Sequence, residues 1–69
     1  MLLSATVGCK EFRNRKAEVL RKVGEDKQFG IRMYIDDVAL GIEWFGLHNE
    51  SYAESAAENY VLGIKNYVQ

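Results

Sequence analysis

The chain has 69 residues, of which 48% are hydrophobic and 28% are charged, and its formal net charge is −1. This composition is typical of a folded protein and unlike that of disordered chains, and the length leaves room for only one hydrophobic core. The lone cysteine, Cys9, has no partner for an intramolecular disulfide, which favours a reducing, cytoplasmic location. Polar residues follow the first three residues too soon for a signal peptide or a membrane span. We therefore expect one small domain over residues 1–69, with no membrane partner.

The charges are unevenly distributed along the chain. Residues 1–35 carry eight Lys or Arg against four Asp or Glu, whereas residues 36–69 carry one Lys against six Asp or Glu. This separation predicts a basic surface for phosphate groups together with an acidic surface for another protein, or head-to-tail attraction between copies. An evenly solvated surface is the alternative.

Hydrophobic alternation in the first third of the chain predicts strands. In residues 3–8, Leu3, Ala5 and Val7 alternate with polar residues, which indicates an additional strand. Residues 16–23 fit both helical spacing and alternation. A strand is favoured, because the polar segment 24–28 has the length of a hairpin loop and would let this run pair with the next one.

Two further alternating runs predict a hairpin. In residues 29–35, the apolar side chains at every second position are expected to face the core, so Arg32 and Tyr34 face away from it. In residues 38–45 the same pattern begins at Val38, and Trp44 is expected to fill the space under the helix. Asp36 and Asp37 predict a tight turn between the runs, of undetermined type.

The last third of the chain predicts a helix from about Ser51 to Tyr67. Ser51 and Glu54 have the spacing of a capping box. Apolar residues recur at intervals of three and four and form one stripe: Ala53, Ala56, Ala57, Tyr60, Val61, Ile64, Tyr67 and Val68. The predicted fold is α+β: an antiparallel meander of three strands, or four with residues 3–8, with the C-terminal helix packed on one face.

The residues that could perform catalysis are few and scattered. His48 is the only histidine, and no second histidine or cysteine pair accompanies it to form a zinc site. Cys9 has no neighbouring base to activate it, and the glycines form no phosphate-binding motif. We therefore expect no catalytic, cofactor-binding or metal-binding residues, and expect that the protein is not an enzyme.

One group of basic residues predicts nucleic-acid binding. Arginines with an interleaved aromatic residue on an exposed sheet can hold phosphates and stack on bases. The candidate nucleic-acid-binding residues are Arg13, Arg15, Lys16, Arg21, Arg32 and Tyr34, with Lys22 as an alternative to Arg21 on the outer face of the sheet. A charged, solvated face that serves only solubility is the competing interpretation.

Tyrosines in the helical segment predict self-association. Tyr52, Tyr60 and Tyr67 are suitable as interface anchors, although packing in the core is the commoner role for such residues. A domain of this size gains stability from a partner subunit. We expect a homo-oligomer, with a dimer favoured, formed through the helix or through an open edge of the sheet.

The segments 40–45 (LGIEWF) and 51–60 (SYAESAAENY) carry a resemblance to known domains. The order of elements over residues 16–65 resembles the three-strand-plus-helix DNA-binding domains of the AP2 and integrase type. The resemblance implies that the sheet enters the DNA major groove and assigns this role to Arg21, Arg32 and Tyr34. Glu43 and the net negative charge depart from that family's pattern. The chain is also similar in style to short uncharacterised accessory proteins of marine tailed phages, which implies no activity.

These observations lead to two functional hypotheses. The first is a small protein-interaction or structural module that self-associates. The second is nucleic-acid binding through a basic face of the sheet.

Overall fold

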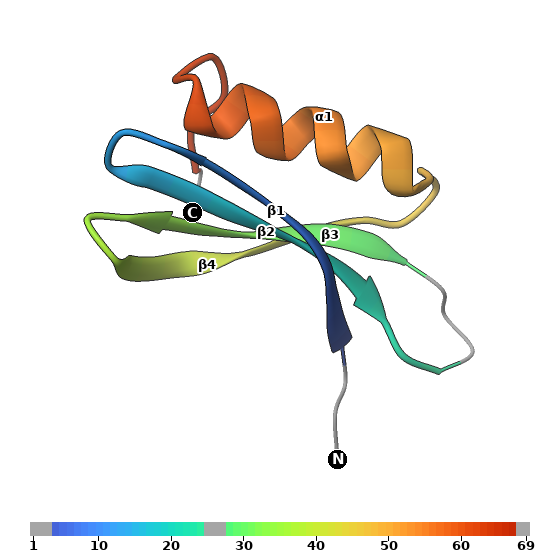
Figure 1. Cartoon of the computed structure of the whole chain (residues 1–69). Helices are drawn as coiled ribbons and strands as arrows, with labels where there is room; N and C mark the ends of the chain where they lie inside the picture. Colours follow the sequence, from blue (N-terminus) through green and yellow to red (C-terminus); the bar gives the residue numbers. More distant parts are fainter. Residues whose placement is uncertain (1–3, 25–27, 68–69) are drawn as a thin grey trace.

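The computed structural model describes residues 4–24 and 28–67. Four strands form one antiparallel sheet in chain order, β1 (Ser4–Phe12), β2 (Arg15–Lys22), β3 (Phe29–Ile35) and β4 (Val38–Phe45). The helix α1 (Glu50–Val61) then crosses one face of this sheet (Figure 1). The predicted α+β meander with a C-terminal helix on one face is therefore confirmed, with the N-terminal run as the fourth strand.

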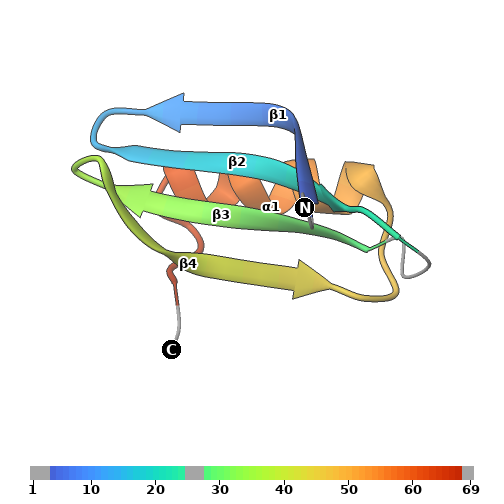
Figure 2. The ribbon, with the colours of Figure 1, turned by 90° about the horizontal axis from the view of Figure 1, so that it is seen from below.

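The sheet has a helix face, which α1 covers, and an open face, which is turned toward the viewer in Figure 2. The core lies on the helix face, where Ala17 and Val19 of β2 pair with Met33 and Ile31 of β3. The helix contributes small residues and one large one to this core: Ala53, Ala56, Ala57, Tyr60 and Val61. Because alanines have short side chains, α1 can approach the sheet closely.

The helix covers β1, β2 and β3 but makes little contact with β4. A helix is about 10 Å across and neighbouring strands are about 4.8 Å apart, so one helix cannot span four strands. Part of β4 is covered instead by the segment after the helix, where the Lys65 ammonium lies 2.9 Å from the Glu43 carboxylate. The ring of Tyr67 packs directly on Gly41, where no side chain could be accommodated.

The predicted orientation of β4 was wrong. Phe45 pairs with Phe29 and faces the core, whereas Trp44 pairs with Gly30 on the open face. The pairing register between β3 and β4 shifts near Leu40, at the point where the paired residue of β3 changes from Met33 to Tyr34. Alternation alone could not show which of the two apolar faces of β4 the core would use.

The turn between β3 and β4 consists of the two predicted residues, Asp36 and Asp37. Their φ angles are 51° and 65°, and two successive residues with positive φ are the feature of a type I′ turn. This turn type matches the right-handed twist of the paired strands, and aspartate adopts positive φ more readily than most residues.

The helix begins at Glu50, close to the predicted start near Ser51, but the predicted cap and the predicted end were wrong. The N-cap is Asn49, whose side-chain oxygen accepts a hydrogen bond of 3.0 Å from the amide of Tyr52, so the Ser51–Glu54 capping box is not used. The helix ends at Val61, and Gly63 follows with a φ of 83°. A positive-φ glycine after the last turn ends helices commonly. Ile64 and Tyr67 therefore lie outside the helix, and Val68 lies outside the described residues.

Candidate interaction surfaces

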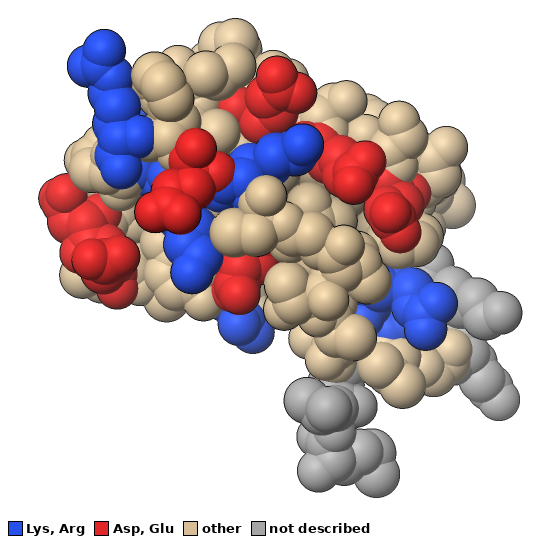
Figure 3. All heavy atoms as spheres, viewed as in Figure 1, with Lys and Arg blue, Asp and Glu red and all other residues tan. Residues whose placement is uncertain are grey.

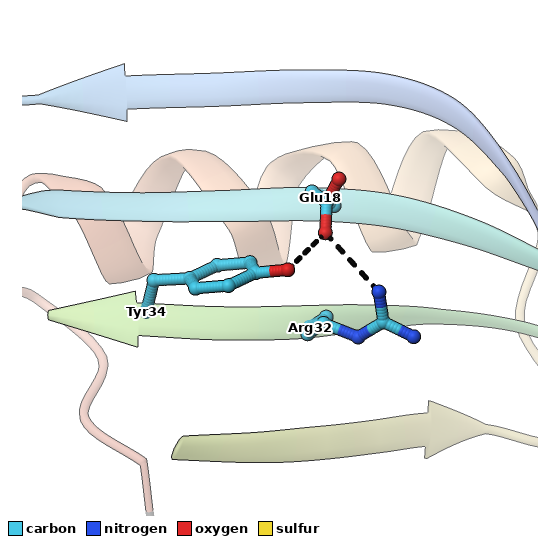
Figure 4. Close-up of polar contacts among 3 residues, drawn as sticks. All are labelled: Glu18, Arg32 and Tyr34. Atoms are coloured by element: carbon cyan, nitrogen blue, oxygen red, sulfur yellow. Dashed lines mark hydrogen bonds and ion pairs between the residues drawn. The ribbon is translucent and has the colours of Figure 1, made fainter. Parts of the chain in front are cut away.

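Three of the predicted nucleic-acid-binding residues share the open face. Glu18 of β2 is paired with Arg32 of β3, and Lys16 is paired with Tyr34, so these four side chains alternate with those of the core. Figure 4 shows Tyr34 and Arg32 directed toward Glu18. The Tyr34 hydroxyl donates a 2.6 Å hydrogen bond to Glu18 Oε1, and Arg32 Nη1 lies 3.4 Å from the same oxygen.

This network orients the Arg32 guanidinium, and the carboxylate of Glu18 offsets part of its charge. The neighbouring Tyr34 hydroxyl, together with the negative charge of Glu18, raises the pKa of Arg32 above its ordinary value. The guanidinium remains partly exposed, with 36% of the side chain accessible. Arg32 is therefore a fixed cation whose outer edge is available to a ligand.

The other three predicted residues lie elsewhere. Arg13 is in the turn between β1 and β2, with a φ of 56°. Arg21 is paired with Phe29, which places it on the helix face, so its neighbour Lys22 is the residue that shares the open face with Arg32. Arg15 is also on the helix face, in register with Ile35.

Arg15 binds the end of the helix. Its Nη1 donates hydrogen bonds of 3.0 Å to the Tyr60 carbonyl and 3.3 Å to the Lys65 carbonyl, and its Nη2 donates one of 3.1 Å to Asn66 Oδ1. The guanidinium carbon also lies 4.9 Å from the centre of the Tyr60 ring. These contacts join the last turn of α1 and the segment that follows it to the start of β2, so Arg15 has a structural role.

Sequence reasoning missed the contribution of Trp44 to the open face. The indole lies against Gly30, where an added Cβ would be 2.7 Å from Trp44 Cε3. Lys22 Nζ lies 5.8 Å from the indole centre, and Lys16 Nζ lies 5.1 Å from the ring centre of Tyr34. The signal in the sequence was Gly30, a glycine inside a strand, which often marks a close approach by another group.

A second surface runs along β4. This strand is an edge of the sheet, and its apolar side chains Val38, Leu40 and Ile42 are 60%, 36% and 38% exposed. Beside it, between the end of β4 and α1, lies an open groove of about 530 Å³. Its lining includes Phe45 and Tyr52, whose rings meet edge to face at 5.2 Å.

The predicted separation of charge does not extend over the side of the molecule shown in Figure 3, where acidic and basic side chains are interspersed.

Cys9 is exposed on β1, and the His48 ring stacks on Tyr52 with their centres 3.7 Å apart. Within residues 4–24 and 28–67, no three His, Cys, Asp or Glu side chains gather as a metal site would require. In the same part of the chain, no helix has the length and apolar character to cross a membrane.

Comparison with protein-family models, with curated proteins and with solved structures finds no match for this chain. The two surfaces on which a function could be based are the open face of the sheet and the exposed edge of β4.

Proposed function

We propose that the protein is a non-enzymatic interaction module that self-associates as a homodimer through the edge of β4. The observation that carries this proposal is the difference between the two edges of the sheet. Residues 38–42 of β4 are uncharged and include three exposed apolar side chains, those of Val38, Leu40 and Ile42. The other edge strand, β1, has the charged residues Lys10 and Glu11 near its end, beside the turn to β2. Charged residues protect an edge strand against pairing, and an uncharged apolar edge favours it.

Antiparallel pairing of β4 with its copy would produce a continuous eight-stranded sheet. Such a dimer is isologous, with a two-fold axis perpendicular to the sheet, so both helices lie on the same side. Because the paired strands run in opposite directions, the groove at the end of each β4 would lie at one of the two ends of the junction. The partly exposed Tyr52 lines this groove.

Sedimentation-velocity analysis of the wild type and of Leu40→Lys tests the proposal. The wild type is expected to sediment as a dimer, and the lysine to shift it to a monomer, because an isologous interface brings two copies of the new charge together. Val7→Lys is the matched control, since Val7 is 41% exposed on the opposite edge strand. A monomeric wild type, or equal dissociation of both variants, would contradict the proposal.

A further inference from the structure

We infer that the open face of the sheet binds single-stranded nucleic acid, with Trp44 and Tyr34 stacking on bases and Lys16, Lys22 and Arg32 holding phosphates. This inference does not depend on self-association, because all five residues belong to one chain. It rests on the combination of two aromatic rings with three cations on one face of a sheet.

The two aromatic rings lie on neighbouring strands of the same face. Tyr34 is on β3 and Trp44 is on β4, and the register places both opposite to the core. The indole lies against Gly30, where two of its ring atoms would be 2.7 and 3.1 Å from an added Cβ, so β3 supports the ring. A base can stack on such a supported ring whatever its identity, because every base presents a π face.

The cations surround these rings. Lys16 approaches Tyr34, Lys22 approaches Trp44, and Arg32 lies on β3 between Gly30 and Tyr34. Among the described residues, two carboxylates lie on the same face as these three cations: Glu18 and, at the edge, Glu11, which is paired with Lys16. The face retains a positive balance although the whole chain is negative, which fits a polyanion that binds weakly and is sensitive to salt.

The lysine amines do not prevent stacking. A contact between an ammonium group and an exposed ring is weaker than the stacking of a base on that ring. The lysine side chain is long and flexible, so its amine can leave the ring and pair with the phosphate of the stacked nucleotide. The present contacts therefore hold each cation near the position where a phosphate would arrive.

Single strands fit this surface better than a duplex does. The bases of a duplex are stacked on one another and are not available to rings on a flat sheet, whereas the bases of a single strand can unstack and spread. Reading of a duplex by the sheet, as the resemblance to AP2-type domains implies, would use Arg21. That residue lies on the helix face, away from Arg32.

The experiment uses the intrinsic fluorescence of the protein, because Trp44 is its only tryptophan. The full chain is titrated at low salt with oligothymidine DNA and oligouridine RNA of about ten nucleotides, a length within the range of known single-strand sites. Saturable quenching by either is expected, and the difference between them shows whether DNA or RNA is preferred. With three phosphate contacts, log K should fall against log salt with a slope of about −2, since each contact contributes about 0.7.

Paired variants separate stacking from charge. Tyr34→Leu should weaken binding about tenfold, whereas Tyr34→Phe, which keeps the ring, should not. Lys22→Gln should reduce the salt slope by about 0.7, whereas Arg21→Gln, which removes a cation from the helix face, should leave it unchanged. Circular dichroism verifies that each variant is folded.

Four results would overturn the inference. The first is the absence of quenching at low salt, and the second is equal quenching by heparin, a polyanion without bases. The third is tighter binding of a duplex of the same length. The fourth is an equal effect of Arg21→Gln and Lys22→Gln, which would show that charge alone, with no defined face, accounts for the binding.

Discussion

Arg15 connects the start of β2 to the end of α1, and it shows how one residue can be misread from sequence. It was predicted to bind nucleic acid, yet its guanidinium donates hydrogen bonds to the Tyr60 and Lys65 carbonyls. Arg15→Ala should lower the free energy of unfolding by about 2 kcal/mol, because hydrogen bonds from a charged donor to the last turn of α1 and to the segment after it are lost. Urea denaturation measures this change. Arg21→Ala is the control, and an equal loss in both variants would contradict the structural role.

Tyr60 is buried, and its hydroxyl donates a 2.9 Å hydrogen bond to the Tyr34 carbonyl. Burial raises the pKa of the Tyr60 phenol above its ordinary value, with an opposing effect from the nearby charge of Arg15. The folded state therefore holds this proton more tightly than the unfolded state. The resulting stability is present below the unfolded pKa of about 10 and is lost as pH rises through the folded pKa.

Urea denaturation between pH 7 and pH 11 should accordingly show stability that falls above about pH 10. Tyr60→Phe should cost about 1 kcal/mol at pH 7, because the Tyr34 carbonyl loses its donor, but its stability should fall less steeply in alkali. Tyr52→Phe, at a half-exposed tyrosine, should keep the wild-type pH dependence. If Tyr60→Phe also keeps it, the buried phenol is not the titrating group.

At the scale of elements, the two possible caps of α1 can be distinguished. Asn49 accepts a hydrogen bond from the Tyr52 amide, whereas Ser51 lies within the first turn. Asn49→Ala should therefore lower the free energy of unfolding by about 1 kcal/mol, the usual contribution of an N-cap side chain. Ser51→Ala should change it by less than about 0.5 kcal/mol, as exposed surface substitutions do. The reverse order in urea denaturation would restore the capping box predicted from sequence.

The elements also show which features the sequence could predict. Residues 29–35 alternate clearly, and the structure confirms that Ile31 and Met33 face the core. In β4 both faces are apolar, so the burial of Phe45 depends on where α1 lies, and local pattern does not contain that information. The end of the helix depends likewise on Gly63 and on Arg15, which lies 45 positions before the carbonyl it binds.

The candidate sites also contain some residues that the sequence placed correctly and others that it could not place. Alternation placed Arg32 and Tyr34 correctly on the outer face of the sheet, because that property is local to one strand. The contribution of Trp44 was missed, because it depends on the register between β3 and β4. The sequence analysis named an open edge of the sheet as one route to association but did not identify β4, because strand order and helix position together decide which edge stays uncovered.

At the scale of the whole molecule, both the size and the architecture favour association of two copies. A chain of 69 residues has a small core and limited stability of its own. Its one described helix covers three of four strands, and Val38, Leu40 and Ile42 of β4 remain exposed. Pairing of two β4 edges would bury these side chains and add strand hydrogen bonds, so folding and association should be coupled.

Coupling makes thermal stability depend on protein concentration. If the native state is a dimer and the unfolded state a monomer, mass action raises Tm by about 5 °C for each tenfold increase in concentration, given the unfolding entropy typical of a chain of this length. Differential scanning calorimetry over a hundredfold range measures this shift. Leu40→Lys should unfold at a Tm that is lower and independent of concentration, whereas Val7→Lys should keep the wild-type dependence. A constant Tm for the wild type would mean that the domain is stable alone, and that the exposed edge of β4 serves a partner other than a second copy of the chain.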